Sequence, residues 1–494
     1  MNEYKCDLRS HGNRQVEIKT HYPVPSFTKL KYDLEVYIFA PSQLQLNKEK
    51  YGVKRFLDDL RTYTRYSTPS IPLDRLPDPE CDVSPLVRIR KQLNDAKIRS
   101  DLDQHKLLYE LRTLCNVYRV ATRDVFDILE GEIESKGDAG LLIKRIELHM
   151  EQIDDFLKDM RKLRTELMVP HVSDYLRKAF DWTDESISLN TEIEMYKFHH
   201  LLQSQSELAK SARMVYRRLT WETEYRQKAG YVSIVSEDNP VDNEMVLYRE
   251  SILKKWSQAI MYMSTEESKS AVRMTHVVAS VAAAAAMAFA VFATIMAGRF
   301  FASYSVPWAL LIVVSYIFKD RIKEMLRSVL VALLPRLVAD EMKRLIDPAV
   351  DRTVGTTKGL VRFCRANDLP VAVNQVRNAA QNPFRSILPA ENVIHFHKRI
   401  RLNGKLLQEN HTRLESITEV LRIKLDDWID EMDNPVNRLS LVKEGKIREV
   451  MANRVYHIHL IAQLSQAKDT EPSFFHYTLI LTQNGLIRIE ELDG

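Results

Sequence analysis

Apolar residues continue almost without interruption between residues 277 and 318. Two runs that contain no charged residue, 277–298 and 300–318, are separated only by Arg299. A helix of about 22 residues is roughly 33 Å long, which is enough to cross a bilayer core of about 30 Å. The pattern therefore predicts a two-helix transmembrane hairpin over residues 275–318. The alternative is a buried helical hairpin inside a large bundle.

The charges that flank this hairpin predict its orientation. Lysine and arginine residues precede and follow it, whereas Arg299 is the single charge between the two runs. Under the positive-inside rule, both flanks then face the cytoplasm. We therefore predict a protein integral to the cytoplasmic (inner) membrane, with both termini in the cytoplasm and the lipid bilayer as a partner.

Small and aromatic residues inside the two runs indicate how the hairpin would pack. The residues that we take as the membrane anchor are Ala283, Ala286, Ala290, Trp308 and Leu311. Alanines at spacings of three or four share one helical face and let another helix approach closely. That helix belongs either to the same hairpin or to a second subunit. The alternative is that an alanine-rich helix simply carries alanine on every face.

Residues 86–270 follow a helical period. Apolar side chains recur every three or four residues along two successive stretches, at Leu107, Leu111, Leu114, Tyr118 and Leu129, and then at Ile146, Met150, Ile153, Met160 and Leu163. A spacing close to 3.5 is typical of a coiled coil or an antiparallel bundle. Asp184 suits the N-cap of a third helix. We therefore predict a cytoplasmic helical bundle that binds itself or a protein partner.

Alternating apolar and polar residues predict strands near the start of the chain. Residues 15–41 contain two such stretches around a proline-bearing turn. Residues 48–66 follow with a pattern that indicates a helix, and a proline-punctuated linker ends near residue 85. Residues 1–85 are therefore predicted to be an N-terminal α+β segment.

The C-terminal part changes character after the hairpin. Residues 319–390 predict an amphipathic, helical juxtamembrane region. Residues 391–494 contain several strand-like stretches and an Asn484-Gly485 turn signal, with a helix expected over residues 416–432. They predict a small β-rich domain. The sequence leaves open whether the N-terminal strands join its sheet.

The predicted fold class is accordingly an α+β membrane protein. It consists mainly of a helical bundle or coiled coil, with a two-helix transmembrane hairpin and a small β-rich C-terminal domain.

Two His-x-His repeats in the C-terminal domain carry the clearest candidate chemistry. The candidate ligand-binding residues are His395, His397, Arg399, Arg401, His457 and His459. Alternate residues of a strand share one face, so each pair projects together. Four imidazoles on adjacent strands would suit zinc, and imidazole with guanidinium would suit an anion. The alternative is a solvent-facing sheet surface whose alternation happens to use histidine.

Composition narrows the classes of function. The 71 basic and 67 acidic residues nearly balance, so the sequence carries no strong nucleic-acid signal. The four cysteines are isolated and show no C-x-x-C spacing, which is typical of a reducing compartment and excludes a zinc ribbon. No motif of a known catalytic site occurs. The sequence therefore names no catalytic residue, cofactor or resident metal, and it does not favour an enzyme.

These observations favour a membrane-anchored, cytoplasm-facing scaffold, adaptor or ligand-sensing protein. The alternative is an oligomeric pore-forming effector that is gated by its cytoplasmic domains. A third hypothesis is a metal- or anion-dependent activity in the His-x-His domain. The ligand, the partner and the oligomer number stay open.

Overall fold

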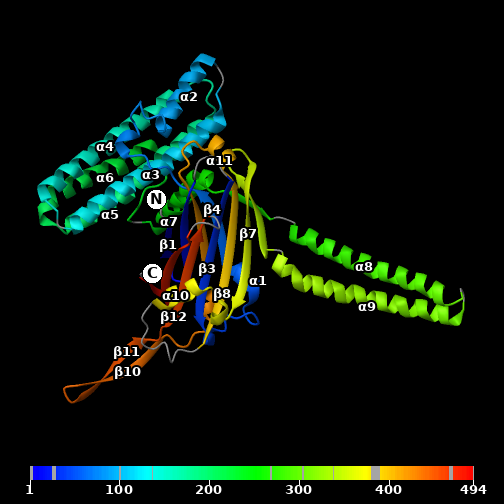
Figure 1. Cartoon of the computed structure of the whole chain (residues 1–494). Coiled ribbons are helices and arrows are strands. Elements are labelled where there is room, and N and C mark those ends of the chain that lie inside the picture. The colour runs from blue at the N-terminus through cyan, green and yellow to red at the C-terminus, as the bar shows by residue number, and fades with distance from the viewer. Residues whose placement is uncertain are drawn as a thin grey trace.

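The computed structural model describes most of the chain. The described residues are 4–24, 29–99, 102–135, 137–237, 239–267, 270–302, 305–337, 339–379, 390–466 and 471–492. Figure 1 shows three parts: a bundle of long helices, a body of antiparallel strands beside it, and a pair of helices that projects from the body.

The helices and strands alternate irregularly along the chain. The helices are α1 (Gly52–Asp59), α2 (Pro85–Arg99), α3 (Gln104–Glu134), α4 (Ala139–Glu166), α5 (Asp174–Gln203), α6 (Ala209–Ala229), α7 (Pro240–Gln258), α8 (Ser270–Phe300), α9 (Val306–Leu337), α10 (Val371–Ala379), α11 (Gly404–Asn410) and α12 (Asp426–Ile429). The strands are β1 (Lys5–Ser10), β2 (Gln15–Pro23), β3 (Lys29–Pro41), β4 (Leu60–Tyr66), β5 (Ser264–Glu267), β6 (Glu341–Asp347), β7 (Arg352–Cys364), β8 (Glu391–Asn403), β9 (Ser416–Lys424), β10 (Val436–Lys443), β11 (Lys446–Asn453), β12 (Tyr456–Ser465), β13 (Ser473–Thr482) and β14 (Gly485–Leu492).

The strands of the described residues form three antiparallel sheets. Their orders are β1-β2-β9-β4, β14-β13-β12-β3-β8-β7-β6-β5 and β10-β11. The N-terminal strand β3 lies near the middle of the eight-stranded sheet, where Tyr37 is opposite His395 of β8 and Ile461 of β12. The N-terminal strands therefore do join the C-terminal sheet, which the sequence had left open.

The main hydrophobic core lies between the four-stranded and the eight-stranded sheets. It contains alternate residues of strands from both, such as Ile18 of β2, Val36 of β3 and Leu421 of β9. Burying one face of each strand in this way is the usual source of stability of a two-layer β structure. A fully buried ion pair, between Lys398 Nζ of β8 and a Glu419 carboxylate oxygen of β9 at 2.5 Å, links the two sheets through this core.

A second core lies inside the helical bundle of α2 to α6. The apolar stripe along α3 and α4 is buried there, together with Phe180 of α5 and Val215 of α6. Asp184 does not cap a helix. Helix α5 begins ten residues earlier, behind Ser173, and Asp184 is a fully buried acceptor for Arg161 at 3.2 Å and for Tyr225 at 2.5 Å. The N-cap prediction was wrong because a short polar residue inside a helix can serve buried partners instead.

Two further helix predictions were wrong. Residues 48–66 contain only the short helix α1 before the strand β4, and residues 416–432 contain the strand β9 before the short helix α12. Strand β9 lies between β2 and β4, and five consecutive residues, 417–421, are buried. A strand that is buried on both faces lacks the strict apolar and polar alternation of a half-exposed strand, so its pattern is easily taken for that of a helix.

Residues 319–390 are less helical than expected. Helix α9 continues to Leu337, but strands β6 and β7 then add to the eight-stranded sheet. Residues 380–389 lie outside the described residues. The segment therefore supplies part of the sheet as well as a helix.

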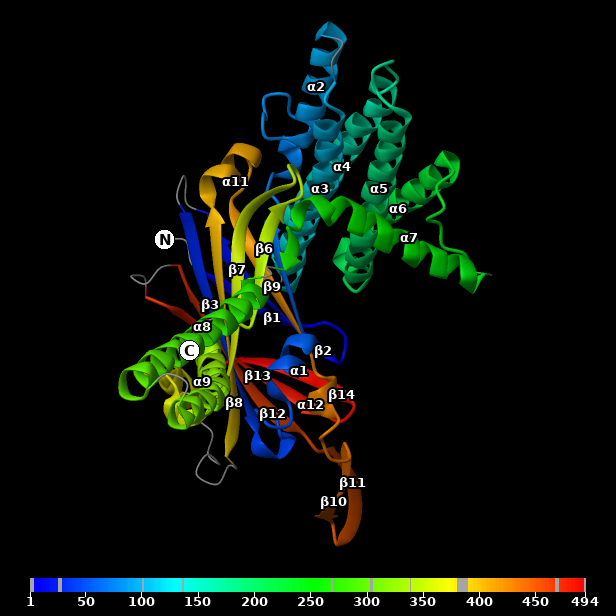
Figure 2. The same ribbon diagram turned by 90° about the vertical axis from the view of Figure 1, so that its right-hand side faces the viewer.

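The apolar runs do form two helices, and both views show them side by side and extending from the body (Figures 1 and 2). Residues 303 and 304 of their connection lie outside the described residues. Only one segment of the described chain, Ala279–Phe300 in α8, is long and apolar enough to cross a membrane. Helix α9 has only about 13 residues before its first charge at Lys319, or roughly 20 Å, which is shorter than a bilayer core.

A single membrane crossing by α8 is also incompatible with the strand pairing in the eight-stranded sheet. Strand β5 precedes α8 and strand β6 follows α9, yet β5 and β6 are paired neighbours. One crossing would place these two strands on opposite sides of a bilayer. The predictions of a transmembrane hairpin, of an α+β membrane fold and of a location in the cytoplasmic membrane with both termini cytoplasmic are therefore wrong. The fold is instead α+β with large antiparallel sheets.

Candidate ligand-binding site

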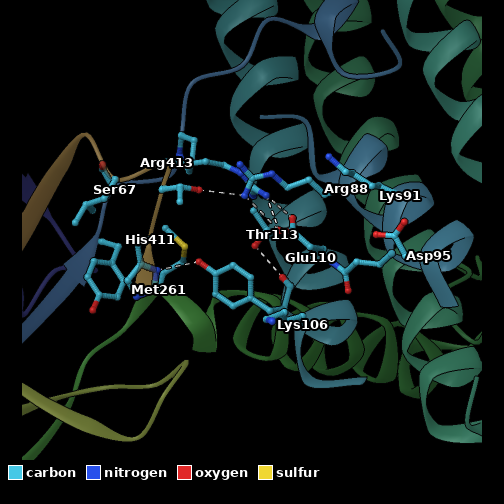
Figure 3. Close-up of a pocket in the computed structure, with 16 residues that line it drawn as sticks. Ser67, Arg88, Lys91, Asp95, Lys106, Glu110, Thr113, Met261, His411 and Arg413 are labelled. Carbon is cyan, nitrogen blue, oxygen red and sulfur yellow. Dashed lines mark hydrogen bonds and ion pairs between the residues drawn. The ribbon is translucent and has the colours of Figure 1, made fainter. Parts of the chain in front are cut away.

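A cavity of about 340 Å³ lies where the helical bundle meets the two large sheets. We call it the junction cavity. Its walls are formed by α2 and α3 on the bundle side, and by the end of β4 and the loop between α11 and β9 on the sheet side. In Figure 3 the side chains of Arg88, Glu110 and Arg413 approach one another from these elements. A volume of this size is at the lower end of the range for small-molecule sites.

Glu110 of α3 is the centre of the charged cluster in this cavity. Both of its carboxylate oxygens accept from Arg413 Nη2 at 2.6 Å, and Arg88 Nη1 lies 3.8 Å from Oε1. Arg88 of α2 also donates to the Thr412 hydroxyl at 3.1 Å. Figure 3 shows Arg88 and Arg413 converging on Glu110 from opposite sides. One buried carboxylate is thus shared by two guanidinium groups and joins the bundle to the sheets.

This arrangement leaves one hydrogen-bond donor of Arg413 without an acceptor. Its side chain is only 8% exposed, and its buried Nε has no hydrogen-bond acceptor among the described residues. A buried donor without an acceptor costs about 1–3 kcal/mol. Burial and then the positive charge of Arg413 hold the pKa of Arg88 below its usual value. The cluster therefore has a deficit of negative charge and of acceptors.

A chain of hydrogen bonds connects the cavity wall to the eight-stranded sheet. The Tyr109 hydroxyl lies 3.0 Å from Nδ1 of His411, and Nε2 of His411 lies 2.8 Å from the fully buried Asp347 carboxylate at the end of β6. The Tyr66 ring packs on the same imidazole with centroids 4.2 Å apart. Burial raises the pKa of Tyr109 to about 12, so its phenol keeps its proton near neutral pH. His411 is therefore held in one orientation from both ring nitrogens.

The charges that line the junction cavity have a positive excess. Four cationic side chains, Arg88, Lys91, Lys106 and Arg413, face two acidic ones, Asp95 and Glu110. Lys91 is exposed and has no ion-pair partner within the described part of the chain. Guanidinium and ammonium groups around a partly enclosed space favour phosphate or carboxylate groups. The arrangement can bind an anion.

The first His-x-His pair lies elsewhere, on the outer face of the eight-stranded sheet. Nε2 of His395 contacts Glu35 at 2.8 Å, and Nε2 of His397 contacts Asp33 at 2.7 Å. Arg399 Nε donates to the same Asp33 oxygen at 2.8 Å. Each of these side chains therefore has a carboxylate partner on the adjacent strand β3. Arg401, at the end of β8, is exposed.

The second His-x-His pair lies on the same face but not next to the first. Strand β3 separates β12 from β8, so Tyr37 and Ile461 lie between His395 and the β13 residue His476. His457 is exposed, whereas His459 is buried and its Nδ1 lies 3.1 Å from the Thr478 hydroxyl. The structure therefore does not bring the four imidazoles together. Over the described residues, no group of three or more histidine, cysteine or acidic side chains is placed to hold a metal ion.

The five residues taken as a membrane anchor lie in the projecting helices. Ala286 and Ala290 are buried, Ala283 is partly buried on α8, and Trp308 and Leu311 are partly buried on α9. Larger apolar residues of α8, such as Phe292 and Ile295, are exposed. The alanine face is thus used inside the helix pair.

Sequence reasoning missed the junction cavity. Its central residues, Glu110 and Arg413, are 303 positions apart in the chain. A signal was nevertheless present, because Glu110 lies three residues after Leu107 and four before Leu114, on the apolar face of α3. A carboxylate on a buried stripe requires a cationic or hydrogen-bonding partner.

Comparison with protein-family models, with curated proteins and with solved structures found no match.

Proposed function

We propose that this protein is a ligand-sensing protein that binds a small molecule bearing a phosphate or carboxylate group in the junction cavity. The observation that carries the proposal is Arg413, whose side chain is more than nine-tenths buried in the cavity wall while its Nε lacks an acceptor. An anionic group in the cavity would compensate the charge of this guanidinium and would offset the positive excess of the lining residues.

The position of the cavity between the bundle and the sheets supports a role in sensing the ligand rather than only binding it. Glu110 and Arg88 belong to the bundle, whereas Thr412 and Arg413 belong to the loop that leads into the four-stranded sheet. A ligand that competes for either arginine changes the contacts that hold these two parts together. Ligand binding then shifts the equilibrium between different arrangements of the bundle relative to the sheets.

Isothermal titration calorimetry of the full chain with inorganic phosphate and with pyrophosphate tests the proposal. We expect at least one of these probes to bind. Arg88→Gln should weaken that binding by about tenfold or more, because it removes a charge-assisted contact. Lys91→Gln should weaken it about two- to fivefold, as expected for an exposed charge.

Lys178→Gln is the matched control, because Lys178 is an exposed lysine on α5 outside the cavity lining. Its affinity for the probes should equal that of the parent protein. Hydrogen exchange of α2, α3 and the 411–414 loop should slow when the probe is added. Absence of binding by both probes, or an equal loss of affinity in all three variants, would overturn the proposal.

The other predicted roles have different standing. A scaffold or adaptor role stays a prediction, and the cavity geometry does not test it. The pore-forming alternative was argued from the transmembrane hairpin and loses that argument, but the cavity geometry does not test it. A metal-dependent activity of the His-x-His residues has no further support in the geometry described above.

A further inference from the structure

The strands β10 and β11 form an arm that extends clear of the body in both views (Figures 1 and 2). Among the described strands they pair only with each other, through a register that runs from Val436 opposite Asn453 to Lys443 opposite Lys446. The two-residue connection has positive φ at Glu444 (54°) and Gly445 (72°), which is the geometry of a type I′ turn. The arm is therefore a regular hairpin of two eight-residue strands.

This arm is not stabilised by packing against the other residues that the structure describes. Every residue of β10 is exposed, and in β11 only Ala452 is partly covered. The exposed residues include Val442 and Ile447, at 72% and 76%. A two-stranded ribbon alone is marginally stable in water and usually needs a third strand or a packed face. The arm has the form of a docking element for a strand.

The register shows which backbone groups of β10 are available. In a hairpin closed by a two-residue turn, the pair that flanks the turn exchanges hydrogen bonds, and every second pair after it does the same. Lys443, Leu441 and Leu439 therefore bond to β11, whereas Val442, Ser440 and Arg438 direct their N–H and C=O groups outward.

Two hydrogen bonds agree with this assignment. Arg454 N donates to Pro435 O at 2.8 Å, which continues the bonded series at the base of the arm. Arg438 N donates to the Asn437 side-chain oxygen at 3.0 Å rather than to β11. Apart from the Arg438 N–H, the outward donors and acceptors of β10 are thus open to a further strand.

The sequence of β10 is complementary to itself around Ser440. In an antiparallel pair of two copies centred there, Ser440 meets Ser440 of the second copy in a hydrogen-bonded pair. Leu439 then meets Leu441 of the second copy, in the closer non-hydrogen-bonded type of pair, and Arg438 meets Val442. Apolar side chains are matched across strands in the positions where such contacts stabilise a sheet.

The edge of β11 does not offer an equivalent pairing. Glu449 lies at its centre, so a symmetric antiparallel pair would place two carboxylates directly opposite each other. Like charges in that position destabilise the pair. Strand β10 contains no acidic residue, so its pairing around Ser440 avoids this repulsion, which favours β10 as the edge that meets the second copy.

We propose that the β10 edge of the arm pairs with β10 of a second copy of this chain, forming a continuous four-stranded antiparallel sheet around a two-fold axis at Ser440. The interface is small, so the dimer forms reversibly and depends on protein concentration. This inference is independent of the anion-binding function proposed for the junction cavity.

Sedimentation velocity of the full chain over a wide range of concentration tests the dimer. Ser440→Pro should weaken dimerisation at least about tenfold, because proline removes the central outward N–H and cannot join a new ladder. The fold of the arm should survive, since that N–H has no role in the β10–β11 ladder. Ser440→Ala keeps the N–H and should dimerise like the parent protein.

Oxidative cross-linking gives an independent readout. Cα atoms of a hydrogen-bonded pair are about 5.5 Å apart, which a disulfide can bridge, so Ser440→Cys should yield a linked dimer. Glu449→Cys on β11 should not. The parent protein, whose four cysteines are free, supplies the background. A monomer at all concentrations, a dimer unchanged by Ser440→Pro, or equal cross-linking at positions 440 and 449 would overturn the inference.

Discussion

The junction cavity and the β10–β11 arm both leave polar groups without partners, but they do so at opposite levels of burial. In the cavity the unpaired group is Arg413 Nε, on a side chain that is 8% exposed. In the arm the unpaired groups are backbone donors and acceptors at an exposed strand edge. Water can satisfy the second kind and cannot easily reach the first.

This difference separates two kinds of recognition. In the cavity two guanidinium groups share one buried carboxylate, so a ligand of negative charge gains much from entering it. An exposed strand edge costs little when it is free, so its partner binds weakly and reversibly. Specificity in the cavity comes from charge, whereas in the arm it comes from register.

The largest expected effect concerns the buried charges of the cavity. Glu110→Gln removes the carboxylate that compensates Arg413, and leaving a buried guanidinium uncompensated should lower the free energy of unfolding by about 3 kcal/mol. Urea denaturation measures this loss. Glu151→Gln, at an exposed position of α4, is the control.

The same variant should bind phosphate more tightly, because the cavity gains net positive charge. Stability and affinity thus move in opposite directions, which a purely structural role of Glu110 does not predict. If Glu110→Gln lowers the free energy of unfolding no more than Glu151→Gln does, the buried charges of the cavity contribute no more than an exposed charge. The contrast between the cavity and the arm would then be lost.

An intermediate effect is expected from pH, and it concerns the body rather than the arm. Burial, followed by the nearby positive charge of Arg377, lowers the pKa of His459 to about 3 and that of His476 to about 4. The unfolded chain binds these protons below about pH 6.5, whereas the folded chain does not. The associated stability is complete above that pH and is lost as the pH falls toward 4.

Urea titrations at pH 7 and pH 5 measure this dependence. Each histidine should account for on the order of 1 kcal/mol of the difference. His459→Gln should therefore flatten the pH dependence, while His457→Gln, at an exposed position of the same strand, should leave it unchanged. An unchanged slope in His459→Gln would show that this imidazole is not kept neutral by the fold.

The smallest expected effect concerns the arm. Ser440→Pro should change the free energy of unfolding of the monomer by less than about 0.5 kcal/mol, because the lost N–H points to solvent. Leu441→Pro, one residue along, removes a donor of the β10–β11 ladder and should abolish hydrogen-exchange protection in the arm. If both substitutions have the same effect on this protection, the assigned register of free groups is wrong.

Local pattern was sufficient where neighbours in sequence are neighbours in space. The spacing of apolar residues along α3 and α4 matches the stripe that the bundle buries, and alternation in β8 places Ile394 and Phe396 in the core while His395 and His397 face outward. Hydrogen bonding in a helix and alternation in a strand both act over a few residues. Such elements can be read from a short window of sequence.

Local pattern failed where tertiary contacts override it. Residues 417–421 of β9 are buried on both faces of the strand, so the simple alternation of a half-exposed strand is missing. The charge-free runs of α8 and α9 suggested a membrane, but pairing of β5 with β6 joins the segments before and after them in one sheet. The partners of the His-x-His residues, Asp33 and Glu35, lie about 360 positions away in the chain.

The sequence by itself determined the helical bundle stripe, the inward and outward faces of the strands that alternate, and the absence of a recognisable catalytic motif. Only the tertiary structure decided that β3 joins the C-terminal sheet, that Glu110 and Arg413 meet in a cavity, and that β10 and β11 stand apart as an arm. The physical reason is the distance along the chain over which each feature is determined. Periodicity reports which face of an element is buried, whereas ion pairs, cavities and free edges depend on which elements the folded chain brings together.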